Sequence, residues 1–191
     1  MAGANLRQEV FAQKMIFPEV CLVHGLGGSP NGSVKELEKE LLQLGRRQPY
    51  VRPLMPHSDM KITSVMPSVA HLETLGLPQG TLVVGVSMGG LVASRLQESS
   101  RPDLHVICIN APTWAGDVEL EQRVERRYSF YSSTDEVIAG RIARWPSLAE
   151  AYDLPWLTGH DTDPCKRQLA AIIDAYMESG RIDPKLLTES F

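Results

Sequence analysis

A serine stands between two glycines at the end of an apolar run, where residues 82–89 read LVVGVSMG. Gly85 lies two residues before Ser87, and Gly89 lies two residues after it. This G-x-S-x-G spacing is typical of a sharp strand-to-helix turn that exposes a serine hydroxyl. Glycine suits both flanking positions because a side chain there would collide with neighbouring backbone. We therefore predict that Ser87 is a nucleophile; the alternative is a simple turn residue.

A second glycine-rich segment, HGLGG at residues 24–28, follows an earlier apolar run. A serine nucleophile needs a base, an orienting acid, and hydrogen-bond donors for the negative charge that develops on the substrate oxygen. We predict that the backbone N–H groups of Leu26 and Met88 are these donors and form an oxyanion hole. The alternative is a flexible loop that only connects a strand to a helix.

The two segments together, HGLGG at 24–28 and GVSMGG at 85–90, resemble those of the α/β-hydrolase superfamily. The short chain is similar to its small lidless serine hydrolases, esterases and minimal lipases, over about residues 20–180. The sequence departs from the pattern at Val86, where many members carry histidine. The resemblance implies a catalytic triad in the chain order nucleophile, acid, base.

The resemblance also places the acid after a later strand and the base before the last helix. Asp135 follows a predicted strand and is the predicted acid, which holds the imidazole of the base in one tautomer. Two alternatives remain: Asp135 caps the helix expected after it, or Asp117 is the acid. His160 lies between the last predicted strand and the last predicted helix, and it is the predicted base.

The chain has five histidines, and the other four receive different roles. His24 belongs to the glycine-rich segment. His71 and His105 are expected to be structural, because one lies within a predicted helix and the other within a predicted strand. The residues proposed to line a substrate pocket are His57, Met55 and Trp114.

These residues predict a serine hydrolase that cleaves a carboxylic ester or thioester of a small acyl substrate, through an acyl-enzyme on Ser87. Amide cleavage or acyl transfer would use the same groups, and a non-catalytic binding protein on the same scaffold is a further alternative. No cofactor and no metal are expected, because His, Cys and carboxylate residues form no group with metal-ligand spacing.

Alternating apolar and helix-like segments must bring these residues to one edge of a sheet. Strands are expected at residues 20–24, 50–54, 81–86, 104–110, 128–131 and 152–157. Helices are expected at residues 33–44, 65–75, 87–98, 136–145 and from 163 onward, with a weakly helical charged segment at 119–126. This alternation predicts a three-layer α/β fold with a mostly parallel sheet of about six strands and helices on both faces. We expect one domain over residues 1–191, with 1–16 loosely packed and no lid domain.

The composition of the chain indicates which classes of partner and which cellular compartment to expect. The net charge is −4 and basic residues form no dense cluster, which argues against a nucleic-acid surface. No run approaches the roughly 18 apolar residues of a membrane span, and no signal-peptide core is visible. Three cysteines without metal-type spacing indicate a reducing compartment, so we predict a cytoplasmic protein. The sequence leaves the oligomeric state open.

Overall fold

The computed structural model describes residues 17–188, so the predicted N-terminal segment 1–16 lies outside the described residues. A six-stranded sheet has the order β2-β1-β3-β4-β7-β8, and every neighbouring pair is parallel, which confirms the predicted sheet. Its strands are β1 (Val20–Val23), β2 (Tyr50–Val51), β3 (Leu82–Val86), β4 (His105–Ile109), β7 (Arg127–Tyr131) and β8 (Glu150–Asp153). A separate antiparallel hairpin joins β5 (Trp114–Ala115) to β6 (Val118–Glu119).

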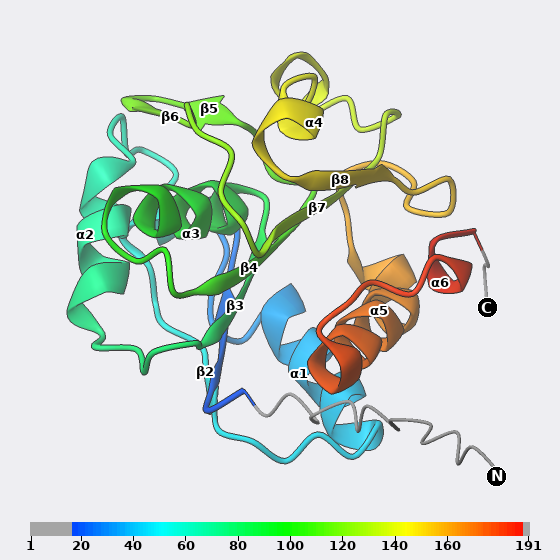
Figure 1. Ribbon diagram of the computed structural model, residues 1–191. Coiled ribbons are helices and arrows are strands. Elements are labelled where there is room, and N and C mark those ends of the chain that lie inside the picture. The colour runs from blue at the N-terminus through cyan, green and yellow to red at the C-terminus, as the bar shows by residue number, and fades with distance from the viewer. Residues whose placement is uncertain (1–16, 189–191) are drawn as a thin grey trace, which may run out of the picture.

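Helices cover both faces of the sheet, as predicted (Figure 1). The helices are α1 (Ser33–Gln43), α2 (Met66–Thr74), α3 (Met88–Ser99), α4 (Trp145–Leu148), α5 (Lys166–Ser179) and α6 (Lys185–Thr188). Short 3₁₀ helices are Pro56–Ser58, Ala139–Arg141 and Asp163–Cys165. On one face α2 packs with α3, and on the other α1 packs with α5. The result is a three-layer α/β architecture.

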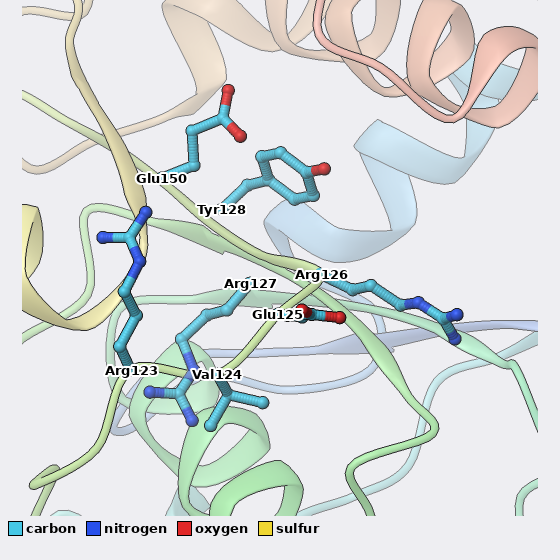
Figure 2. Close-up of a pocket in the computed structure, with 7 residues that line it drawn as sticks. All are labelled: Arg123, Val124, Glu125, Arg126, Arg127, Tyr128 and Glu150. Atoms are coloured by element: carbon cyan, nitrogen blue, oxygen red, sulfur yellow. The ribbon is translucent and has the colours of Figure 1, made fainter.

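The amino ends of β7 and β8 border a cavity of about 410 Å³, lined in part by Arg123 and Arg126 (Figure 2). Buried Arg127 donates from Nε to Gln97 Oε1 at 3.0 Å, and Gln97 Nε2 donates to the Leu104 carbonyl at 2.9 Å. These bonds tie the end of α3 to the starts of β4 and β7. The cavity therefore lies at the edge of the sheet where strands begin, opposite to the edge that the glycine-rich segments follow.

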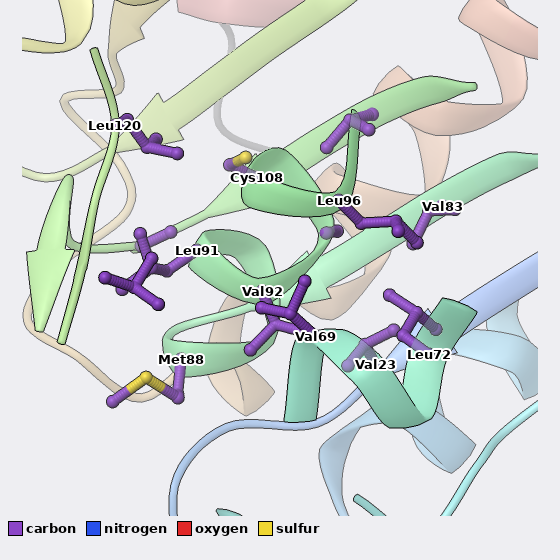
Figure 3. Close-up of a cluster of buried hydrophobic side chains, with 14 of the residues drawn as sticks. Val23, Val69, Leu72, Val83, Met88, Leu91, Val92, Leu96, Cys108 and Leu120 are labelled. Carbon is purple, nitrogen blue, oxygen red and sulfur yellow. The ribbon is translucent and has the colours of Figure 1, made fainter. Parts of the chain in front are cut away.

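Alternate residues of the central strands enter two hydrophobic cores. Cys21 and Val23 of β1 join the core under α2 and α3, part of which is drawn in Figure 3. Val20 and Leu22 join the core under α1 and α5. Burial on both faces explains why β1, β3 and β4 read as apolar runs without polar alternation. Because parallel strands end at the same edge, the residues that follow β1, β3, β4, β7 and β8 gather there.

Two predicted helices are wrong. Residues 119–126 are not helical: Glu119 belongs to β6, and the Leu120 N–H donates to the Thr113 carbonyl at 3.0 Å, so the segment starts as extended backbone. The N–H groups of Glu121 and Gln122 then donate to the Glu98 carboxylate of α3, each at 2.9 Å. Residues 136–145 contain only a 3₁₀ turn and the first residue of α4. The carbonyl of Arg141 accepts from the backbone and hydroxyl of Thr113, so it is unavailable to a helix.

The last strand lies earlier than predicted. β8 spans Glu150–Asp153, whereas the sequence pattern predicts 152–157. Pro155 explains the difference, since it has no N–H to offer a ladder. The backbone N–H of Leu154 makes the last bond toward β7, donating to the Tyr131 carbonyl at 2.9 Å. The chain then runs through irregular structure to His160, which lengthens the loop that carries this histidine.

Between β4 and β7, the chain has only the β5–β6 hairpin and irregular loops. The described residues thus include no lid domain, as predicted. Among residues 17–188, no helix is both long enough and apolar enough to cross a bilayer.

Candidate active site

Ser87 occupies a strained turn between β3 and α3. Its φ is 51° and its ψ is −122°, a region that residues other than glycine rarely adopt. A Cβ added to Gly85 would lie 2.4 Å from Gly89 backbone, and one added to Gly89 would lie 2.3 Å from the Val23 carbonyl oxygen. Both glycines are therefore required by close backbone packing. The Ser87 N–H donates to the Ile109 carbonyl at 2.8 Å, which ties the turn to β4.

Ser87, His160 and Asp135 form a hydrogen-bonded chain. His160 Nε2 lies 2.9 Å from Ser87 Oγ, and His160 Nδ1 lies 2.7 Å from Asp135 Oδ2. A carboxylate only accepts hydrogen bonds, so Nδ1 carries the imidazole proton and Nε2 is left to accept from the serine hydroxyl. In this tautomer Nε2 is free to take a proton from Ser87, which is what a general base must do.

Asp135 is fully buried and uses both of its oxygens. Oδ1 accepts from the backbone N–H of Val137 at 2.9 Å and from that of Ile138 at 3.4 Å, while Oδ2 faces His160. The helix that Asp135 is expected to cap is absent, and its Oδ1 binds the N–H groups of a turn instead. One oxygen holds the turn that follows Asp135, and the other orients the imidazole.

The segment after β1 lies against the Ser87 turn. A Cβ added to Gly25 would lie 3.1 Å from the Ser87 Cβ. The next residue is Leu26, and Met88 is the first residue of α3, where N–H groups have no acceptor within a helix. Within residues 17–188, the N–H groups of Leu26 and Met88 donate to no backbone carbonyl. Both donors are available to a ligand oxygen.

A cavity of about 220 Å³ opens beside Ser87 and His160. Its lining includes Leu26 and Val86, together with the polar Thr162. The hydrogen-bonded chain, the two free N–H groups and this cavity lie at the edge where the parallel strands end, which is the usual ligand position in open α/β sheets.

Solved structures with a similar arrangement of strands and helices include α/β hydrolases. A carboxylesterase from Mesorhizobium loti matches with a TM-score of 0.61 and 16% identity, covering 87% of this chain and 90% of that chain. Alpha/beta hydrolase domain-containing protein 10 from mouse matches with a TM-score of 0.64 and 13% identity, covering 84% and 89%. The ydeN gene product from B. subtilis matches with a TM-score of 0.60 and 16% identity, covering 83% of this chain and 97% of that chain. The chain has the α/β-hydrolase fold. No protein-family model and no curated protein matches the sequence.

In this α/β-hydrolase fold, Asp117 is engaged away from His160. Its Oδ1 accepts from the backbone N–H of Val65 at 2.5 Å and from that of Met66 at 3.4 Å, at the start of α2. Its Oδ2 accepts from the Ser64 hydroxyl at 2.5 Å, a hydrogen bond that lowers the pKa of Asp117 below its ordinary value. Asp117 thus joins the β5–β6 turn to α2, and Asp135 is the carboxylate that His160 contacts.

None of the three residues predicted to line a substrate pocket borders the cavity beside Ser87. His57 and Met55 are fully buried, with 0% and 1% of their surface exposed, so neither borders the cavity beside Ser87. Trp114 is 43% exposed but lies outside that cavity, and the Arg141 guanidinium stacks 4.6 Å from its ring centroid. The cavity wall comes from the segment after β1, the first residue of α1, the turn after β3 and the loop that carries His160.

His57 instead holds the glycine-rich segment 24–28 in place. Its Nε2 donates to the His24 carbonyl at 2.8 Å, and its own carbonyl accepts from the Gly27 N–H at 2.9 Å. Its Nδ1 lies 3.0 Å from the Ser68 hydroxyl, which donates to it when the ring is neutral. Burial favours the neutral form and lowers the pKa of His57 to about 4. Sequence reasoning missed this role because the contact joins segments 33 residues apart.

Buried histidines predict how stability depends on pH. The pKa of His57 and that of His105 are each lowered from 6.5 to about 4, mainly because burial disfavours the charged ring. Between pH 6.5 and about pH 4, these two histidines bind protons in the unfolded chain but not in the folded chain. The free energy of unfolding should therefore fall as pH decreases from 6.5 toward 4, by up to about 1.4 kcal/mol per pH unit for each histidine. Urea unfolding across this window measures the slope, and a flat profile would contradict the prediction.

No described residues form a group of three or more His, Cys, Asp or Glu side chains arranged to hold a metal ion. The three cysteines are free and buried in the structure. Burial raises the pKa of Cys21 to about 12 and that of Cys108 to about 11, so both thiols stay protonated at neutral pH. These cysteines act as small hydrophobic residues of the core.

Proposed function

We propose that this protein is a serine hydrolase that cleaves a carboxylic ester or thioester. Ser87 Oγ attacks the acyl carbon while His160 Nε2 takes the hydroxyl proton, and Asp135 stabilises the resulting imidazolium. The N–H groups of Leu26 and Met88 receive the negative charge that develops on the carbonyl oxygen. His160 then returns the proton to the departing alcohol or thiol, which leaves an acyl ester on Ser87.

Deacylation completes the cycle with the same groups. His160 Nε2 takes a proton from water, and the hydroxide attacks the acyl ester on Ser87. The carboxylic acid departs as His160 returns the proton to Ser87 Oγ. Each step uses groups of this chain, so the reaction consumes only the acyl substrate and water.

The observation that carries this proposal is the unbroken chain from the strained Ser87 through His160 to Asp135 at the wall of a cavity. Strain at a residue other than glycine persists only where the surrounding structure requires it, and it is concentrated at functional sites. The carboxylesterase among the structural neighbours is in keeping with the same chemistry. Amide cleavage and acyl transfer would employ the same three residues, and a substrate panel separates them.

The size of the cavity limits the acyl group. At about 220 Å³ it lies below the roughly 300–1,000 Å³ typical of pockets that enclose larger ligands. A long acyl chain would leave most of its methylenes in water, where each forgoes up to about 0.8 kcal/mol of burial. We therefore propose short acyl groups as substrates.

A panel of p-nitrophenyl esters and acyl thioesters from acetyl to dodecanoyl tests this proposal. Because the described chain has no lid, we expect Michaelis-type turnover of soluble short-chain substrates, with no jump in rate at the solubility limit. We expect kcat/KM to be flat or to fall with chain length. A matched panel of p-nitroanilides distinguishes amide cleavage, and added alcohols distinguish acyl transfer.

Three outcomes would contradict this proposal. A sharp rise in rate at the emulsion boundary requires a mobile cover over Ser87. A strong preference for long acyl chains requires a tunnel larger than the cavity beside His160. Binding of acyl compounds without product release would favour a binding protein over an enzyme.

The free, buried cysteines also fit a reducing environment. On this basis we propose that the protein acts in the cytoplasm. Fractionation of cells that produce the full chain tests the proposal, since recovery with secreted proteins would contradict it.

A further inference from the structure

Asn110 is a buried amide at the carboxyl end of β4, one residue beyond Ile109. Its φ is 45°, in the left-handed region where asparagine is several-fold enriched among residues other than glycine. None of its side chain is exposed to solvent, so its amide must find its hydrogen-bond partners inside the protein. Those partners lie on the two loops that carry the acid and the base.

The side chain of Asn110 joins these two loops directly. Nδ2 donates to the Gly159 carbonyl at 2.9 Å, and Oδ1 accepts from the Ser132 N–H at 3.0 Å. The orientation of the amide is fixed, because a carbonyl only accepts and an N–H only donates. Gly159 immediately precedes His160, and Ser132 opens the turn that leads to Asp135. One amide therefore spans the two segments whose side chains must meet.

The Ser87 turn is also tied to the end of β4, through a backbone hydrogen bond beside Asn110. The carbonyl of Ile109, the neighbour of Asn110, accepts from the Ser87 N–H at 2.8 Å. We infer that Asn110 is a positioning residue, which holds the loops of Asp135 and His160 in register with the Ser87 turn. The catalytic consequence rests on the function proposed above, whereas the geometric role stands on these hydrogen bonds.

Loops are the more mobile parts of a fold, so the distance between two loop side chains needs a fixed support. Asp135 and His160 are 25 residues apart and lie on different loops. Removing the amide leaves the Ser132 N–H and the Gly159 carbonyl unpaired in a buried site, and the two loops then settle independently. A misplacement of about 1 Å in a catalytic group costs about 10²-fold in rate.

The test compares two isosteric substitutions, Asn110→Asp and Gln97→Glu. Both convert a fully buried amide into a carboxyl group, and both amides donate to backbone carbonyls. Gln97 lies near the end of α3 that is far from Ser87, so a loss of activity in its variant would report general damage to the fold. We expect Asn110→Asp to lower kcat by about 10- to 100-fold with little change in KM. We expect Gln97→Glu to keep the wild-type kcat per folded molecule.

A readout independent of activity uses the ¹⁵N chemical shifts of the His160 ring, which report which nitrogen carries the proton. Wild type and Gln97→Glu should hold the Nδ1–H tautomer. Asn110→Gly keeps a left-handed backbone, removes the amide without adding a charge, and should give a mixture of tautomers.

Either of two results overturns the inference: full kcat in Asn110→Asp, or an unchanged single tautomer in Asn110→Gly. If the wild-type protein turns over no acyl compound, the proposed function fails by itself. The tautomer of His160 in Asn110→Gly then still decides whether Asn110 positions the loops.

Discussion

Ser87→Ala is expected to fold normally and to lose ester hydrolysis together with labelling by a fluorophosphonate probe. The substitution removes one hydroxyl that faces a cavity, so packing and the free energy of unfolding should change little. The kcat should fall by about 10⁴-fold or more, because the members of a triad act as a unit. Steady-state assays with p-nitrophenyl acetate and gel-based labelling measure the two losses on the same preparation.

Ser147→Ala provides the matched control. Ser147 is exposed and its hydroxyl donates only to the Arg144 carbonyl, far from the Ser87 turn in sequence. Its variant should keep full turnover and full labelling. Turnover retained by Ser87→Ala would refute the nucleophile assignment, and a wild-type protein that neither reacts with the probe nor releases product would favour a binding protein.

The strained turn at Ser87 could be predicted from the sequence because its steric constraint is local. Gly85 and Gly89 flank Ser87 within one turn, and the steric reason for each glycine involves neighbouring backbone. The alternation of apolar strands with helices was equally readable, since burial on both faces of a parallel sheet leaves continuous apolar runs. Local rules therefore gave the sheet, the helices on both faces and the position of the strained serine.

What the sequence could not give depends on contacts between distant segments. Residues 119–126 have a helix-compatible composition, yet Glu119 pairs with Trp114 in the hairpin and the Leu120 N–H donates to the Thr113 carbonyl. His57 is predicted to line the pocket because it lies in a loop at the sheet edge before the nucleophile, whereas in the structure its ring binds the His24 carbonyl. Asn110 likewise reads as the last residue of a strand. Its amide acquires a role only when the loops after β7 and β8 arrive beside it.

Asp135→Asn is expected to lower kcat by about 10⁴-fold while the protein stays folded. The Val137 N–H donates to Oδ1, so the amide of the variant keeps its oxygen there and turns its NH₂ group toward His160. An NH₂ group donates to Nδ1 and moves the imidazole proton to Nε2. His160 then has no lone pair for the Ser87 hydroxyl, and the serine loses its base. Steady-state kinetics and the ¹⁵N shifts of the His160 ring measure both consequences.

Asp117→Asn separates this effect from the general loss of a carboxylate. Asp117 accepts from N–H groups at the start of α2, and the amide oxygen of the variant can still do so. Loss of the negative charge at a helix N-terminus should cost about 0.3–1 kcal/mol of stability and leave kcat unchanged. Urea unfolding and esterase assays on both variants give the comparison. If Asp117→Asn abolished turnover while Asp135→Asn kept it, the acid would be Asp117, and the contact between Asp135 and His160 would be structural only.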